Sequence, residues 1–158
     1  MERGFQHPFP IIKYNEAARH VHLTERSEKM TAFFMPMIPP TVTAQERRVT
    51  MRHGKPVIYD SPEIKDAKSK ICSGLIGHRP EKPYKSAVRL VVKWCFPKGR
   101  HRNGEYKATP PDTDNLQKML KDCMTECGFW TDDALVASEI CEKFYTDITG
   151  IYIKVDEL

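Results

Sequence analysis

Four aspartates and one lysine form the stretch of the chain whose side chains are best suited to chemistry. They flank a single apolar periodicity and are Asp112, Asp114, Lys118, Asp132 and Asp133. Carboxylates held within a few ångströms of each other repel unless a hard cation such as Mg²⁺, Mn²⁺ or Ca²⁺ lies between them. Such an ion polarises a phosphate and activates a water molecule, while a nearby lysine offsets charge on the phosphate oxygens. These residue types therefore indicate metal-dependent phosphoryl chemistry, provided that they meet in space.

A helix is expected between the two ends of this stretch. Asp114 has the residue type of an N-cap, Gln117 that of its capping-box partner, and Gly128 is a typical helix stop. Apolar residues recur every three or four positions and predict a helix from about 115 to 127 with one buried face: Leu116, Met119, Leu120, Cys123, Met124 and Cys127. Lys118 lies on the polar face of that helix. We expect the acidic side chains on either side of the helix to converge on one ion.

Taken one at a time, these features have structural explanations. An aspartate before a helix is often only a cap, an Asp-Asp pair is often a solvated turn, and a D-x-D pattern occurs by chance. The full pattern, D-x-D-N-L-x-K followed by a helix and then G-F-W-x-D-D, is longer and more specific. It resembles the RusA family of Holliday junction resolvases, which are small metal-dependent DNA endonucleases often carried by prophages. The resemblance is strong over about 111–136 and looser from about Met30 to the C-terminus.

The resemblance implies a catalytic centre and its cofactor. In the family this signature is the catalytic centre, so Asp112, Asp114 and Asp133 are expected to bind one or two Mg²⁺ ions, for which Mn²⁺ can substitute. Asp132 is a further candidate metal ligand, and Lys118 is expected to stabilise the charged transition state. The implied reaction is paired symmetric cleavage of a four-way DNA junction in recombination and repair, leaving 5′-phosphate and 3′-hydroxyl ends. Because two symmetric cuts need two active sites, a homodimer is implied.

The implied fold is a single α+β domain over residues 30–158, with a mixed β-sheet and two helices packed on one face. Residues 1–29 lie outside the resemblance and are expected to form an N-terminal extension, for which a flexible tail is one explanation. The local patterns predict first a strand over 31–38, whose internal Pro36 indicates an edge position or a bulge, and then a hairpin over 47–59 turning at His53-Gly54. A helix capped by Ser61, a buried strand over 86–96, and an antiparallel strand pair over 135–145 and 148–155 follow.

The charge distribution indicates a polyanionic partner. The net charge is only +4, but residues 79–109 hold nine Lys and Arg against two Asp and Glu, whereas residues 110–158 hold four against eleven. A cationic surface beside a carboxylate cluster is expected where a nucleic acid must approach a bound metal. The candidate contacts to the DNA backbone lie in the hairpin and in the basic loop before the signature: Arg47, Arg48, Arg52, Lys98, Arg100, Arg102 and Lys107. Without the aspartate signature, solvated strand and loop faces would explain the same charges.

The composition also bears on compartment. The chain has no run of 18 apolar residues, so no membrane span is expected, and its first 29 residues lack the apolar core of a signal peptide. The five scattered cysteines fit reduced core residues. The cytoplasm is therefore the expected location.

The sequence also allows other interpretations. Zinc at Cys123 and Cys127 lacks a second pair of ligands, and the H-x-H pair His20 and His22 is interpreted as surface residues. A structure-selective DNA-binding protein that does not cleave would use the same basic surface, although every carboxylate position of the signature is filled. A D-x-D glycosyltransferase also binds a divalent ion through aspartates, but it needs a larger nucleotide-sugar domain than this chain offers.

Overall fold

The computed structural model describes residues 30–42 and 48–158, apart from a few side chains in the hairpin, which are those of Arg48, Val57 and Ile58. Some of the sequence predictions fall outside this described part: the extension 1–29 with His20 and His22, and the candidate DNA contact Arg47.

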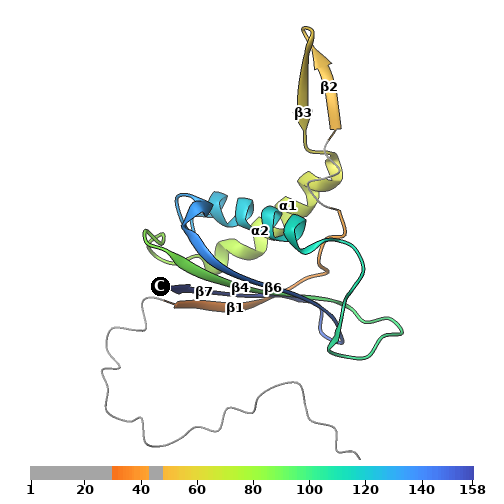
Figure 1. Cartoon of the computed structure of the whole chain (residues 1–158), viewed down its shortest axis with the longest axis vertical. Helices are drawn as coiled ribbons and strands as arrows, with labels where there is room; N and C mark the ends of the chain where they lie inside the picture. The colour runs from red at the N-terminus through yellow and green to blue at the C-terminus, as the bar shows by residue number, and fades with distance from the viewer. Residues whose placement is uncertain (1–29, 43–47) are drawn as a thin grey trace, which may run out of the picture.

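The central strand of the sheet, β4 (Val88–Pro97), builds the core with its alternating side chains. Five of them point to one face and are at most 3% exposed: Val88, Leu90, Val92, Trp94 and Phe96. Helices α1 (Pro62–Leu75) and α2 (Thr113–Glu126) cover this face together (Figure 1). Removing these apolar side chains from water is the main force that holds the helices on the sheet. The predicted buried strand and the predicted α+β fold, with two helices on one face, are confirmed.

The five-stranded sheet has the order β1-β7-β4-β6-β5. Its β4 pairs parallel with β6 and antiparallel with β7, so the sheet is mixed, as expected. The other strands are β1 (Met30–Pro36), β5 (Glu105–Tyr106), β6 (Val136–Thr146) and β7 (Gly150–Glu157). Strand β1 lies at the edge of the sheet, as its proline predicts.

The last two strands are not neighbours, and the prediction of an antiparallel pair over 135–145 and 148–155 is wrong. Strands β6 and β7 run in opposite directions, but β4 lies between them and bonds to both. The reason is burial. Strand β4 is buried at every second position, whereas β6 has no fully buried residue, so β4 occupies the best-covered place in the sheet.

Two of the three helix termini predicted from the sequence are confirmed. Ser61 caps α1, since its Oγ accepts a hydrogen bond from the amide of Ile64 at 3.4 Å. At the end of α2, Gly128 has a φ of +83° and the amide of Phe129 donates to the carbonyl of Met124 at 3.0 Å, which closes the helix in a Schellman motif. In the described part of the chain, no helix is long and apolar enough to cross a membrane.

The predicted hairpin is confirmed, and it stands apart from the five-stranded sheet. Strands β2 (Arg48–Arg52) and β3 (Lys55–Tyr59) form a separate two-stranded sheet. The turn residues His53 and Gly54 have φ values of +49° and +74°, as a two-residue turn of type I′ requires. Figure 1 shows this hairpin projecting from the helix layer near the beginning of α1.

Candidate functional site

Asp112 and Asp114 lie at the N-terminal end of α2, where both residues are exposed. Asp112 is the N-cap residue, and its backbone oxygen accepts a hydrogen bond from the amide of Leu116 at 3.2 Å, but its side chain makes no capping hydrogen bond. The prediction that Asp114 caps the helix is therefore wrong, because the helix begins at Thr113 and Asp114 lies in its first turn. The partial positive charge of a helix N-terminus favours carboxylates at this end.

The segment that leads into Asp112 is anchored to the sheet by a lysine. Lys143 on β6 donates from its Nζ to the carbonyl of Pro111 at 2.7 Å and to the carbonyl of Thr109 at 3.0 Å. Because both acceptors are main-chain oxygens, the lysine fixes the path of the backbone and not merely a side chain. It thereby sets where the first carboxylate of the signature stands relative to β6.

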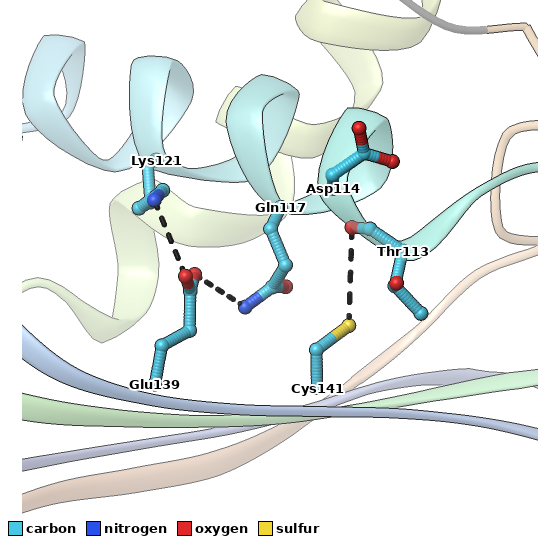
Figure 2. Close-up of a pocket in the computed structure, with 6 residues that line it drawn as sticks. All are labelled: Thr113, Asp114, Gln117, Lys121, Glu139 and Cys141. Atoms are coloured by element: carbon cyan, nitrogen blue, oxygen red, sulfur yellow. Dashed lines mark hydrogen bonds and ion pairs between the residues drawn. The ribbon is translucent and has the colours of Figure 1, made fainter.

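A pocket of about 340 Å³ opens between the first turns of α2 and the middle of β6. Figure 2 shows the residues that line it: Thr113, Asp114, Gln117, Lys121, Glu139 and Cys141. The Glu139 side chain extends from the sheet toward α2, while the Asp114 carboxylate points away from the sheet (Figure 2). Burial raises the pKa of the Cys141 thiol to about 11, so this sulfur stays protonated at neutral pH.

A buried amide links this pocket to the core. Gln117 is 3% exposed; its Oε1 accepts a hydrogen bond from Trp94 Nε1 at 3.3 Å, and its Nε2 donates to Glu139 Oε1 at 2.8 Å. Lys121 Nζ binds the other oxygen of Glu139 at 3.4 Å. The expected capping-box role of Gln117 is wrong, since its side chain faces the sheet and not the helix N-terminus. Sequence reasoning missed Glu139 altogether, because no local pattern connects it with α2.

Asp132 and Asp133 lie after the C-terminal end of α2. Asp132 caps the short 3₁₀ helix Asp133–Leu135, and its Oδ1 accepts a hydrogen bond from the amide of Ala134 at 2.8 Å. Both aspartates are exposed. They line a second pocket, of about 360 Å³, whose other walls are Asp122, Thr125, Glu126 and Thr131.

The structure does not bring the two aspartate pairs together within one chain. Helix α2 has 14 residues and is about 21 Å long, with one pair before it and the other after it. Asp114 and Asp133 line different pockets. Over residues 30–42 and 48–158, no three Asp, Glu, His or Cys side chains are placed to hold one metal ion. The expected convergence of the two pairs on one ion is therefore not seen in the single chain.

The charged side chains of the signature are nevertheless left available. Lys118 is exposed on α2, one turn after Asp114. Within the described part of the chain, the side chains of Asp112, Asp114, Lys118 and Asp133 make no hydrogen bond or ion pair with other residues. These four charges, on α2 and just beyond it, are therefore open to solvent and available to a ligand.

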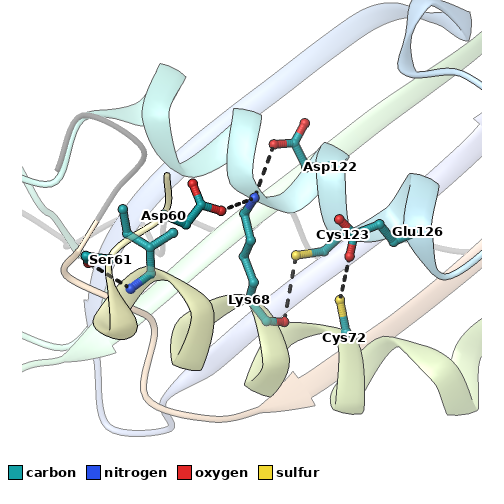
Figure 3. Close-up of polar contacts among 8 residues, drawn as sticks. Asp60, Ser61, Lys68, Cys72, Asp122, Cys123 and Glu126 are labelled. Atoms are coloured by element: carbon teal, nitrogen blue, oxygen red, sulfur yellow. Dashed lines mark hydrogen bonds and ion pairs between the residues drawn. The ribbon is translucent and has the colours of Figure 1, made fainter. Parts of the chain in front are cut away.

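A second polar cluster joins the two helices behind this surface. Lys68 on α1 lies 3.0 Å from Asp60 and 3.8 Å from Asp122 of α2, and its side chain is 17% exposed (Figure 3). Burial lowers the pKa of Lys68, but its hydrogen bond to Asp60 and the charges of both carboxylates outweigh this effect and raise the pKa above its ordinary value. Lys68 therefore stays charged and connects α1, α2 and the end of the hairpin.

Three thiols lie beside this cluster. Cys72 Sγ is 3.9 Å from a Glu126 carboxylate oxygen, and Cys123 Sγ is 3.8 Å from the carbonyl of Lys68 (Figure 3). Burial raises the pKa of Cys123, and it raises that of Cys127 to about 12. Both thiols are therefore protonated at neutral pH.

The candidate DNA contacts fall in two places. In the basic loop, Arg100 and Arg102 are exposed, whereas Lys98 is 2.5 Å from Asp147 and Lys107 lies over the ring of Tyr145 at 5.2 Å. In the hairpin, Arg52 is exposed near the turn, and Arg48 belongs to β2. The loop is ordered by its own contacts, since Glu105 binds the His101 ring and the Arg102 amide.

The chain belongs to the endodeoxyribonuclease RusA family, which matches it over residues 38–156. A similar protein from Lactococcus phage r1t, named crossover junction endodeoxyribonuclease rusA, is 26% identical over 119 residues, which cover 73% of this chain and 89% of that protein. The resemblance predicted from the signature is therefore confirmed. The chain is an endodeoxyribonuclease, a hydrolase that acts on phosphodiester bonds. The matched range contains the hairpin, both helices and both aspartate pairs; strand β1 precedes it but pairs with β7.

Proposed function

We infer that this endodeoxyribonuclease resolves Holliday junctions by paired, symmetric, Mg²⁺-dependent cleavage, with Mn²⁺ able to replace Mg²⁺. The family and the name of the phage relative support the junction as substrate. The nuclease corresponds to residues 30–158, with residues 1–29 as a separate extension. Two symmetric cuts require two active sites, so the working form is a homodimer.

The observation that carries the proposal is the set of unpaired charges on α2 and at its two ends. Asp112, Asp114 and Asp133 are assigned as metal ligands, with Asp132 as a further carboxylate, and Lys118 offsets charge on the phosphate oxygens during cleavage. Keeping like-charged carboxylates without cationic partners is unfavourable in the absence of a ligand. Their availability is expected if a cation and a DNA phosphate complete the site.

The donor set fits Mg²⁺ in part. This ion commonly uses one or two carboxylates and takes its remaining ligands from water and substrate phosphates, so the Asp112 and Asp114 pair suffices to hold it loosely. When bound, it would polarise the scissile phosphate and activate a water molecule. Asp133 lies beyond the far end of α2, and a second copy of the chain is a source from which such a carboxylate could reach the same ion.

The basic side chains are assigned to the DNA backbone. Arg100 and Arg102 are exposed in the loop before Asp112, and Arg52 is exposed in the hairpin. Arg47, Arg48, Lys98 and Lys107 complete the proposed set. Because cations that neutralise phosphates release counterions, we expect junction affinity to fall steeply as salt rises.

The test is cleavage of a synthetic four-way junction in Mg²⁺. Asp112→Asn preserves side-chain shape and removes the metal-binding charge, so it should abolish cutting while junction binding in a gel-shift assay persists. The matched control is Asp66→Asn on α1, an exposed carboxylate paired only with Lys70 at 2.7 Å, which should cut normally. Undiminished cutting by Asp112→Asn would refute the assignment.

The same assay separates the proposal from its rival, a structure-selective DNA-binding protein that does not cleave. That rival predicts junction binding by the unmodified chain without products in either Mg²⁺ or Mn²⁺. Lys118→Ala refines the comparison: it should slow cutting by about a hundredfold while metal affinity changes little.

A further inference from the structure

Lys143 lies where main-chain pairing between β6 and the segment that leads to the signature stops. Residues 107–111, hereafter called the linker, run from the end of β5 to the beginning of the signature. The first linker residue still pairs with the strand, since the amide of Lys107 donates to the carbonyl of Lys143 at 2.9 Å. Pro110 and Pro111 follow, and neither has an N–H to donate. The end of the linker therefore has no main-chain donors with which to bind β6.

The Lys143 side chain supplies donors from the strand instead. It lies on the helix side of β6, beside Trp94 in the register of the sheet. Two of the three N–H donors of its ammonium bind the carbonyls of Pro111 and Thr109, at 2.7 and 3.0 Å. Hydrogen bonds from a charged donor are stronger than those between neutral groups. Because Pro111 directly precedes Asp112, the strand holds the chain immediately before the first carboxylate.

This lysine holds main chain and forms no ion pair. Among the residues that the structure describes, no carboxylate lies within ion-pair distance of Lys143 Nζ. The lysines on the opposite face of the sheet differ, since Lys93 lies 3.5 Å from Glu142 and Lys154 lies 2.8 Å from Asp156. A lysine whose partners are two main-chain oxygens of one segment fixes the course of that segment.

The position of Asp112 depends on its main chain alone. Its side chain makes no capping hydrogen bond and, within the described residues, has no cationic partner. On the helix side, its backbone oxygen accepts a hydrogen bond from the amide of Leu116 at 3.2 Å. On the linker side, the chain is held by Lys143 through Pro111. Loss of the lysine would therefore free one of the two ends that place the carboxylate.

We propose that Lys143 is a positioning residue of the nuclease, which keeps Asp112 where it can share a Mg²⁺ ion with Asp114. The inference rests on the metal ligands assigned in the proposed function and adds the residue that holds one of them in place. Groups that orient metal ligands without touching the ion change metal affinity or activity by about 10- to 100-fold when they are replaced. Lys143 should thus matter for the metal and not for junction binding.

The first test is Mn²⁺ binding by the full chain without DNA, followed by the electron paramagnetic resonance signal of the free ion. Lys143→Met keeps an unbranched apolar side chain but has no donor, so it should weaken Mn²⁺ binding by about tenfold or more. Lys143→Arg should recover most of the affinity, because a guanidinium has donors for both carbonyls. Asp112→Asn identifies the part of the binding that belongs to this site.

The matched control is Lys93→Met. It removes a strand lysine from the opposite face of the sheet and should leave both Mn²⁺ affinity and junction cutting unchanged. Thermal unfolding shows whether each variant is folded at the assay temperature. If Lys143→Met is not folded there, Lys143→Gln replaces it: this side chain stays polar, but it is shorter and uncharged, so it should weaken Mn²⁺ binding in the same way.

The second test is junction cutting over a range of Mg²⁺ concentrations. Lys143→Met should raise the Mg²⁺ concentration for half-maximal cutting by about tenfold. Its junction affinity in a gel-shift assay without metal should be unchanged. A purely structural role would instead lower the rate equally at every Mg²⁺ concentration, which would overturn the proposal. Equal loss of Mn²⁺ affinity in Lys143→Met and Lys143→Arg would overturn it as well, since the account depends on the two hydrogen bonds.

These results separate the positioning role from the proposed activity. If the unmodified chain cuts junctions and folded Lys143→Met has the same metal dependence, the positioning role is wrong and the nuclease function stands. If Lys143→Met loses Mn²⁺ affinity but the unmodified chain does not cut junctions in Mg²⁺ or Mn²⁺, the positioning role stands and the proposed substrate is wrong.

Discussion

The side chain of Gln117 connects three elements through one amide. Its oxygen accepts from the indole of Trp94 on β4 and its nitrogen donates to Glu139 on β6, at 3.3 and 2.8 Å. These contacts fix how α2 is rotated about its own axis over the sheet. That rotation determines the direction in which Asp114 and Lys118 point. Gln117 has no catalytic role of its own, but it orients two residues that are assigned to catalysis.

Gln117→Leu should lower the free energy of unfolding by about 1–3 kcal/mol, because the indole N–H of Trp94 loses its acceptor in a place that water does not reach. Urea denaturation followed by fluorescence measures the change. Lys118→Leu, at the next and exposed position, should change stability by less than about 0.5 kcal/mol. Equal stability of the two variants would show that the amide is not needed for the fold.

Sequence reasoning works well for residues whose role follows from spacing along one element. Alternation in β4 predicted the buried face from Val88 to Phe96, and the three- and four-residue spacing predicted the buried face of α2. The role of Gln117 was not predictable, because its partners are 23 and 22 positions away in the chain. Asp114, three residues earlier, suggested a capping-box role for Gln117, but the Gln117 side chain faces the sheet instead.

At the scale of elements, Lys68 joins α1 to α2 and to Asp60 at the end of the β2–β3 hairpin. Lys68→Met should lower the free energy of unfolding at pH 7 by about 1–2 kcal/mol, because it removes the positive charge that lies 3.0 Å from Asp60 and 3.8 Å from Asp122. Lys70→Met removes a lysine whose pair with Asp66 is largely exposed, at 66% and 63%, and should cost less than about 0.5 kcal/mol.

The sign of the pH dependence follows from the raised pKa of Lys68. A group whose pKa is higher in the folded state stabilises the fold while it is protonated, so its contribution is complete below its ordinary value of 10.5. The contribution disappears as the pH rises through the folded-state pKa. The stability difference between the unmodified chain and Lys68→Met should therefore be constant from pH 7 to 9 and shrink above about pH 10.5. A difference that grows with pH would contradict this account.

The pairing of β1 with β7 depends on a glycine. A Cβ atom at Gly150 would lie 2.6 Å from the carbonyl oxygen of Met35 and 2.4 Å from the ring of Phe34. Gly150→Ala should therefore lower the melting temperature and cost about 1–3 kcal/mol, since the main chain of β1 has to move. Gly77→Ala is the control, because a Cβ there meets nothing within 4 Å. Thermal unfolding of both variants decides the matter.

The order of strands shows where element-level prediction ends. Every long strand and both helices were predicted from local patterns, but β6 and β7 were expected to pair because a short link joins them. Burial instead favours β4 between them, and this depends on which strand the helices cover. Residue patterns reveal how apolar a strand is, but the competition for the central place involves the whole sheet.

At the scale of the whole molecule, α2 acts as a rod with a carboxylate pair at each end. Sequence reasoning treated the two pairs as neighbours because both flank one helix, yet 14 helical residues separate them by about 21 Å. The activity is therefore established by the family match and not by a meeting of the two aspartate pairs within one chain. In a two-fold dimer, the second copy can bring its Asp132 and Asp133 to the Asp112 and Asp114 of the first. We therefore expect each site to be shared between the two copies.

Mixing two inactive variants tests this sharing. One chain has Asp112→Asn and the other has Asp133→Asn, with different tags so that the mixed dimer can be purified. If each site takes Asp112 from one copy and Asp133 from the other, the mixed dimer contains one doubly altered site and one intact site. It should then nick a junction on one strand without resolving it, whereas each variant alone should be inactive. If both carboxylates act within one chain, every site in the mixed dimer has a lesion, so no nicked product forms and the shared arrangement is excluded.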